Sequence, residues 1–225
     1  MKIKNNYFNK FWYNKMIKFT KLIALISLTI LFSFELFSQV YQVTPDVNTC
    51  KAGVLTEAEK QKVLERVNYI RSIHKLKPVN WETAGDAMSM EGCLNIVASG
   101  QSGHVDDPSS ECYTPSGGKA RMESNLFAGS SGGAMNYTSV DIIVGWMIDD
   151  HNADKEREHM VGHRRAIINP FLTKFAFGRA EGSPKSGGGN MVAANFLYQR
   201  YTDGNISDTQ LEYIAYPYEY YPPSF

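Results

Sequence analysis

Apolar side chains recur at helical spacing in four separate stretches of the chain. The first stretch follows a capping-box signature, Thr56-x-x-Glu59, and continues through Val63, Val67 and Ile70. These patterns predict helices over approximately Thr56–Lys75, Glu82–Ser99, Ser139–Asp150 and Glu156–Ile168. Small residues form a stripe along the second helix, which favours close packing against another element.

Two strands are expected after the helices. Thr173–Ala180 and Asn190–Tyr198 flank the turn-rich segment GSPKSGGG, which is typical of a hairpin. Residues 39–54 are expected to form an extended leader. Residues 100–136, rich in Gly, Ser, Pro and Asp, are expected to form a long loop, which is uncommon unless it is functional or tied down. Helices segregated from a short antiparallel sheet predict an α+β fold.

The amino-terminal segment has the pattern of an export signal. Six lysines precede an apolar run, and its uninterrupted part, Leu22–Phe34, has 13 residues, fewer than the ~20 that a spanning helix needs. We therefore expect a secretory signal peptide over 1–38, with translation starting at Met1 or Met16. A signal anchor is the alternative. After cleavage the protein would be extracellular or periplasmic, with no stable membrane span.

Composition and charge narrow the function classes. Of the 225 residues, 43% are hydrophobic and 20% are charged, which is ordinary for a folded domain and excludes wholesale disorder. Outside residues 1–38 the chain has 17 basic and 22 acidic side chains, a net charge of −5. A mildly acidic body without a basic stripe argues against nucleic acid as a partner.

Three cysteines allow one disulfide and one remaining thiol. Cys50 and Cys112 lie among turn-forming residues, whereas Cys93 lies inside an apolar helical pattern. We expect the Cys50–Cys112 pairing, with Cys93 as a small buried residue, although the other two pairings stay open.

Two familiar catalytic motifs match only superficially. His159-x-x-x-His163 has the spacing of a helical metal pair but lacks the glutamate after the first histidine that a zinc peptidase uses. Gly129-x-Ser131-x-Gly133 matches a nucleophile elbow, and Asp149 and His163 follow in the order of a hydrolase triad. That elbow needs a parallel strand before it, and the preceding residues are expected to be helix or loop.

His104 and His163 are the stronger candidates for chemistry. His104 lies in a turn (SGHVDDP) where packing does not demand histidine, and His163 lies in MVGHRRAIINP. Two such imidazoles, brought to one cleft, can bind a metal or transfer protons near neutral pH. His74 belongs to the inward face of the first helix and is expected to be structural, while His151 and His159 lie among charges and are expected to be solvated.

Five segments, taken in order, resemble the CAP superfamily of cysteine-rich secretory proteins, antigen 5 and pathogenesis-related proteins, in its bacterial branch. They are NYIRSIHKLKPVNWE (Asn68–Glu82), SGHVDDP (Ser102–Pro108), ESNLFAG (Glu123–Gly129), VGWMID (Val144–Asp149) and VGHRRAIINP (Val161–Pro170). The resemblance implies a three-layer α-β-α sandwich with a short antiparallel sheet. The corresponding domain would occupy 55–205, followed by a Tyr- and Pro-rich strand or tail over 206–225.

The resemblance also implies a cleft with two histidines and two acids. His104 and His163 match the histidines, and Asp149 matches the second acid. Alignment on Asn125 puts Ser124 at the first acid position, so that Glu123 lies one residue early. No cofactor is required, but His104 and His163 would hold a labile Zn²⁺ or another divalent cation. The binding would be weak because a catalytic zinc site uses three protein ligands.

Three functions follow as hypotheses. The first is a secreted, non-enzymatic module that binds an unidentified extracellular lipid, peptide or protein. The second is an extracellular metal-assisted hydrolase or peptidase that uses His104, His163 and an acid. The third is a surface or adhesion protein that binds its partner through the tyrosine-rich tail. The position of the Glu123 carboxylate discriminates between the first two, because an enzyme would direct it toward the imidazoles.

Overall fold

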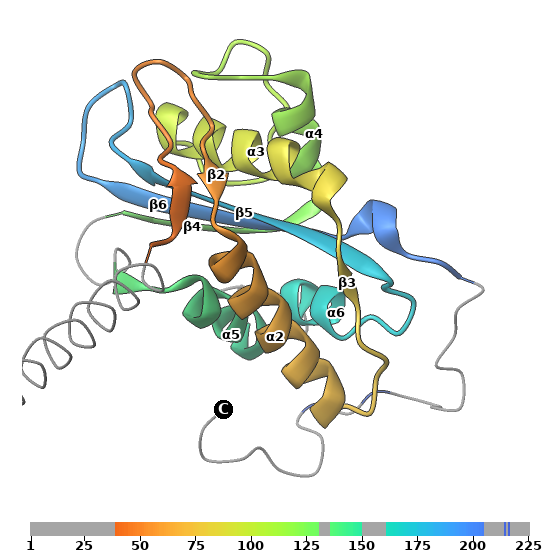
Figure 1. Ribbon diagram of the computed structural model, residues 1–225. Helices are drawn as coiled ribbons and strands as arrows, with labels where there is room; N and C mark the ends of the chain where they lie inside the picture. The colour runs from red at the N-terminus through yellow and green to blue at the C-terminus, as the bar shows by residue number, and fades with distance from the viewer. Residues whose placement is uncertain (1–38, 131–135, 150–160, 205–213, 215, 217–225) are drawn as a thin grey trace, which may run out of the picture. The chain divides into compact units, whose positions relative to one another are not determined.

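The computed structural model describes residues 39–130, 136–149, 161–204, 214 and 216 (Figure 1). The chain divides into two units, Met1–Gln39 and Val40–Phe225. All elements below belong to the second unit. The predicted signal peptide, residues His151 and His159, and most of the predicted tail lie outside the described residues. Among the residues that are described, no helix is both long and apolar enough to cross a membrane.

Five helices and six strands make up the described part of the second unit. The helices are α2 (Glu57–Ile73), α3 (Asp86–Ser99), α4 (Pro115–Met122), α5 (Ser139–Ile148) and α6 (Gly162–Ile167). The strands are β1 (Tyr41–Val43), β2 (Val54–Leu55), β3 (Asn80–Trp81), β4 (Ser124–Ser130), β5 (Lys174–Gly182) and β6 (Met191–Leu197). Two 3₁₀ turns, η1 (Thr83–Gly85) and η4 (Gln199–Tyr201), complete the described elements.

A four-stranded sheet forms the middle layer. Its strand order is β3-β5-β6-β4, with β3 parallel to β5 and the other pairs antiparallel. Helices α3 and α4 cover one face, and α2, α5 and α6 cover the other (Figure 1). A separate apolar cluster fills each interface. The expected α+β fold and α-β-α sandwich are confirmed, as is the predicted β5–β6 hairpin.

Alternating side chains on β5 and β6 set the spacing of the layers. Phe175, Phe177 and Phe196 pack in the cluster with α2, α5 and α6, whereas Ala180 and Ala193 pack in the cluster with α3. Because the α3 face carries small residues, that helix approaches the sheet closely. The expected close packing of the second helix is therefore present, although Ala84 and Ala87 of its small-residue stripe are exposed.

Helix starts follow the expected capping chemistry only in part. The Thr56 hydroxyl accepts a hydrogen bond from the Glu59 amide, as the signature predicts. The reciprocal half of the box is absent from the described contacts, because the Thr56 amide donates to the Val40 carbonyl instead. A complete capping box occurs at the start of α5, between Thr138 and Asp141.

The prediction of a long loop over residues 100–136 is wrong, since the segment is not a continuous loop. It contains helix α4 and strand β4, which pairs with β6 along its whole length. Thr114 caps α4 and Pro115 occupies its first turn, a start signal that the Gly-rich composition masked. Strand β4 also precedes Ser131, where helix or loop was expected. Its pairing with β6 is antiparallel, and Ser131 and Gly133 lie outside the described residues.

The boundaries of the other expected elements differ in detail. Helix α3 begins at Asp86 after the turn η1, rather than at Glu82, and α5 ends at Ile148. In the fourth expected helix the structure describes only α6, because residues 150–160 lie outside the described part. The extended leader contains β1 and β2, which pair with each other antiparallel.

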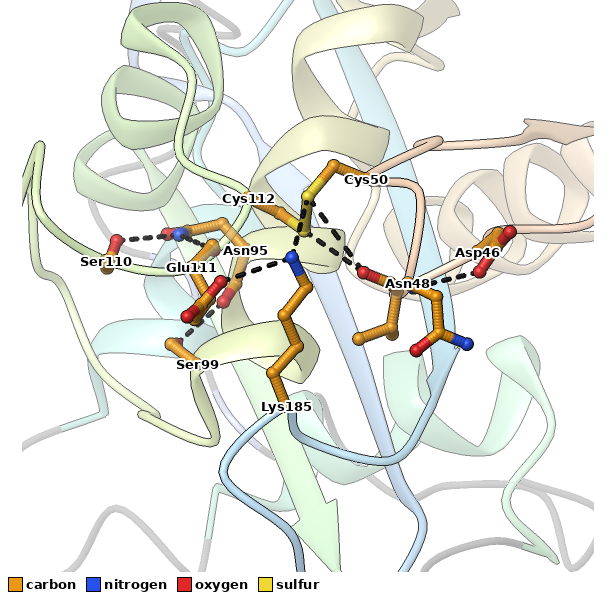
Figure 2. Close-up of polar contacts among 10 residues, drawn as sticks. Asp46, Asn48, Cys50, Asn95, Ser99, Ser110, Glu111, Cys112 and Lys185 are labelled. Atoms are coloured by element: carbon orange, nitrogen blue, oxygen red, sulfur yellow. Dashed lines mark hydrogen bonds and ion pairs between the residues drawn. A yellow bond between two sulfur atoms is a disulfide. The ribbon is translucent and has the colours of Figure 1, made fainter.

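A disulfide joins the β1–β2 loop to the segment before α4. Cys50 and Cys112 form this bond, which confirms the expected pairing, and Cys93 is a free, fully buried thiol. Figure 2 shows Lys185 beside the bridge, with its ammonium 3.3 Å from Cys50 Sγ and 3.2 Å from a Glu111 carboxylate oxygen. The bond therefore ties the edge of the α3–α4 layer to the leader.

Candidate functional site

His163 is oriented by a buried carboxylate. It is the second residue of α6, and its Nδ1 lies 2.9 Å from Asp149 Oδ1. The Asp149 side chain is 0% exposed, and its other oxygen accepts a hydrogen bond from the Arg164 amide at 3.2 Å. An ionised carboxylate only accepts hydrogen bonds, so Nδ1 of the neutral imidazole carries the proton. Nε2 is then left with its lone pair.

Local backbone geometry places Asp149 for this contact. Asp149 follows the last residue of α5 and has a left-handed conformation, with φ of 58°. Aspartate tolerates this region better than most residues, because its short side chain can form local hydrogen bonds. Trp146, one turn earlier, donates from its indole to the Leu126 carbonyl at 3.1 Å. Helix α5 is thereby fixed to β4, and Asp149 with it.

His104 is oriented by a backbone carbonyl. Its Nδ1 lies 2.7 Å from the Arg121 carbonyl oxygen at the end of α4. A carbonyl oxygen can only accept, so Nδ1 again carries the proton in the neutral ring and Nε2 keeps its lone pair. His104 itself is exposed.

The side chain of Arg121 holds the segment that carries His104. Its guanidinium is fully buried and donates to the carbonyls of Gly103 at 2.9 Å and Gln101 at 3.0 Å, and to Asn95. Burial lowers the pKa of Arg121 from its ordinary value, and the surrounding oxygens satisfy its donors. No sequence pattern identified this residue, because its stretch was expected to be a loop and a charged side chain usually faces solvent.

The two candidates for the first acid position have different surroundings. The Glu123 carboxylate accepts a hydrogen bond from Arg200 Nε at 2.6 Å and forms an ion pair with the same guanidinium. Ser124 is buried, and its hydroxyl has no hydrogen-bond partner within the described structure. Neither residue has a described contact with an imidazole, and Arg200 is a partner that the sequence reasoning missed.

One histidine contacts the end of α4 and the other contacts the start of β4. His104 contacts the carbonyl of Arg121, and the Asn125 side chain donates to the carbonyl of His163 at 2.9 Å. Of the expected site residues, Asp149 and His163 are joined directly. Within the described ranges, no three His, Cys, Asp or Glu side chains form a group that could hold a metal ion.

Comparisons with known proteins give a family. The model of the cysteine-rich secretory protein family, CAP, matches residues 64–201. No curated protein matches the chain.

Two solved structures are similar in part. A crystal structure of MpPR-1i soaked with selenourea is 17% identical in sequence and has a TM-score of 0.40. The match covers 64% of this chain and 92% of the MpPR-1i chain. A 1.5 Å crystal structure of an extracellular protein containing an SCP domain, from Bacillus anthracis str. Ames, is 15% identical and has a TM-score of 0.36. The match covers 61% of this chain and 39% of the bacterial protein. The family model spans more than half of the chain and includes both histidines and Asp149, and the chain therefore belongs to the cysteine-rich secretory protein (CAP) family.

Proposed function

We propose that this protein is a secreted binding module whose two histidines hold a divalent cation loosely. The observation that carries the proposal is that both imidazoles use the same ring nitrogen, Nδ1, to contact the protein. In each ring Nδ1 is engaged by an oxygen acceptor, a carboxylate for His163 and a carbonyl for His104. This is the arrangement by which proteins fix the tautomer of metal-binding histidines. Both rings then offer Nε2.

The incomplete ligand set supports a labile cation. Asp149 orients His163, and Glu123 is paired with Arg200, so the described residues offer two ligands where a tight zinc site uses three or four. A bound Zn²⁺ would act as a Lewis acid that attracts an oxygen atom of the extracellular lipid, peptide or protein. Family membership and the disulfide support export, since disulfides persist in oxidising compartments.

The ion pair of Glu123 also favours binding over catalysis. A general base must reach the proton that it removes, and this carboxylate is held by the Arg200 guanidinium. The hydrolase remains the second candidate, because a buried carboxylate behind an imidazole, as in Asp149–His163, is also the arrangement that orients a catalytic base. An unbiased ester and peptide hydrolysis screen of the protein and of His163→Ala, with and without Zn²⁺, tests this candidate. Turnover lost in the variant would favour it.

Calorimetric titration of Zn²⁺ into the purified protein tests the main proposal. We expect a dissociation constant in the micromolar range, weakened at least tenfold by His104→Ala and by His163→Ala. Asp149→Asn should weaken binding by about 10–100-fold, because loss of an outer-shell partner typically costs that much.

His159→Ala is the matched control, because it removes an imidazole four positions before His163. Sub-micromolar affinity that survives His104→Ala, or a loss caused by His159→Ala instead, would show that the site lies elsewhere.

A further inference from the structure

A cavity lies among β2, α2, η1, α3 and β5. Its volume is about 230 Å³. It is lined by Gly53, Val54, Leu55, Lys60, Thr83, Asp86, Ala87, Met90 and Phe177. Leu55, Met90 and Phe177 are buried and form an apolar wall, whereas Val54, Thr83 and Ala87 are exposed and form the rim. The cavity shares no residue with the candidate metal site.

A partly buried ion pair is part of the cavity wall. Lys60 Nζ lies 2.6 Å from Asp86 Oδ2, and their side chains are 11% and 22% exposed. Asp86 also accepts a hydrogen bond from the Trp81 indole at 2.7 Å, and Glu57 accepts one from Lys60 at 2.9 Å. Removing two charges from water is costly, so an ion pair beside an apolar cavity points to a role beyond packing.

The hydrogen-bonding capacity of the pair determines what the cavity can take. The Lys60 ammonium has three N–H donors, and the described carboxylates accept two of them. The Asp86 carboxylate has lone pairs beyond the two that the indole and the ammonium use. A hydroxyl group can accept from the ammonium and donate to the carboxylate. An anion would face Asp86, and a cation would face Lys60, so the pair favours an uncharged ligand.

We propose that this cavity binds a small, uncharged molecule with an apolar body and one hydroxyl group. A water molecule occupies about 30 Å³, so 230 Å³ suits a ligand of roughly eight non-hydrogen atoms. The apolar body packs against Leu55, Met90 and Phe177, while the hydroxyl meets the Lys60–Asp86 pair. One-ring aromatic alcohols and short aliphatic alcohols have this chemistry.

Benzyl alcohol and ethylbenzene are matched probes, since both have eight non-hydrogen atoms and differ by one hydroxyl. Each is titrated into the purified protein and followed by two-dimensional NMR. We expect saturable shifts of the Trp81 indole N–H, whose hydrogen bond to Asp86 lies at the cavity wall, and none for the Trp146 indole. A shift confined to Trp146, or no saturation at millimolar benzyl alcohol, would overturn the proposal.

Two variants separate the location from the chemistry. Ala87→Leu narrows the rim and should weaken binding of both probes at least tenfold, whereas Ala84→Leu, also exposed but outside the lining, should change neither. Lys60→Met removes the ammonium and keeps an apolar side chain. It should weaken the binding of benzyl alcohol at least fivefold more than the binding of ethylbenzene. Equal effects on the two probes would contradict the hydroxyl contact even if Lys60→Met were less stable.

Discussion

At the scale of single residues, three histidines in this chain use one ring nitrogen in the same way. Nδ1 of His74, His104 and His163 lies within hydrogen-bond distance of an oxygen atom from the protein. Their surroundings differ. His74 is 1% exposed and lies at the end of α2, whereas the other two rings reach solvent. Exposure therefore separates the buried histidine from the two histidines of the proposed cation site.

The buried His74 should make the protein less stable in mild acid. Burial lowers the pKa of His74, the nearby Arg164 and Arg71 add to this effect, and the hydrogen bond to the Ile70 carbonyl opposes it. Below about pH 6.5 the unfolded chain therefore binds a proton that the folded chain excludes. The free energy of unfolding should be highest above that pH and fall as the pH falls below it.

Urea unfolding at pH 7.5 and pH 5.5 measures this effect. The decrease in midpoint between the two conditions should be smaller for His74→Gln than for the unchanged protein. An identical decrease in both proteins would assign the acid sensitivity to other groups.

Residues of the candidate site were predictable from the sequence where they lie within a short motif. His104, His163 and Asp149 were expected from the family resemblance, and the structure joins the last two directly. Their convergence with His104 on one cleft stays a prediction. The roles of Arg121 and Arg200 were not predictable, because their partners lie 18 and 77 positions away along the chain, and no local pattern encodes such contacts.

At the scale of elements, contact between α3 and β5 depends on one glycine. A Cβ atom built on Gly178 would lie 2.4 Å from the Ser89 carbonyl oxygen, which belongs to the helix backbone. The next positions on the same face of β5 are Ala176 and Ala180, so small residues along this face allow the helix to lie close to the sheet. A backbone atom cannot move aside as a flexible side chain would.

Gly178→Ala should therefore destabilise the protein by about 1–3 kcal/mol, as overpacking typically does in a rigid core. Gly145→Ala is the matched comparison, because Gly145 lies on the exposed side of α5 with open space around its Cβ position. That change should stabilise by roughly 0.5–1 kcal/mol, since alanine favours helix interiors. Chemical denaturation of both variants checks the signs, and a stable Gly178→Ala would contradict the packing.

Elements with local signals were predictable, and elements set by packing were not. Helices α2 and α5 follow apolar periodicity, and the β5–β6 hairpin follows its turn composition. Helix α4 was missed because of its two interior glycines. Gly117 is required there by packing, since its Cβ would lie 2.9 Å from the backbone of Glu91 in α3. The composition typical of a loop arose from close contact between helices.

At the scale of the whole molecule, the disulfide joins segments that are distant along the chain. It connects the β1–β2 loop to the residues before α4, with a sequence separation of 62. Closing a loop of that length restricts the unfolded chain, which corresponds to about 4 kcal/mol in a chain-entropy estimate.

Replacement of Cys50 and Cys112 together by serine should lower the free energy of unfolding by several kcal/mol. Cys93→Ala is the control, because Cys93 forms no disulfide, so its effect should be limited to about 1 kcal/mol for the small cavity that the lost sulfur leaves. Unfolding in urea without reductant compares the two. A double variant as stable as the control would mean that the bridge adds nothing to the folded unit.

The position of this bridge has a consequence for the two histidines. His104 lies inside the ring of chain that the bond closes, whereas Asp149 and His163 lie beyond it. Opening the ring by a reductant would therefore loosen one imidazole while its counterpart keeps its carboxylate. The strength with which the protein holds the proposed cation would then depend on how oxidising its surroundings are.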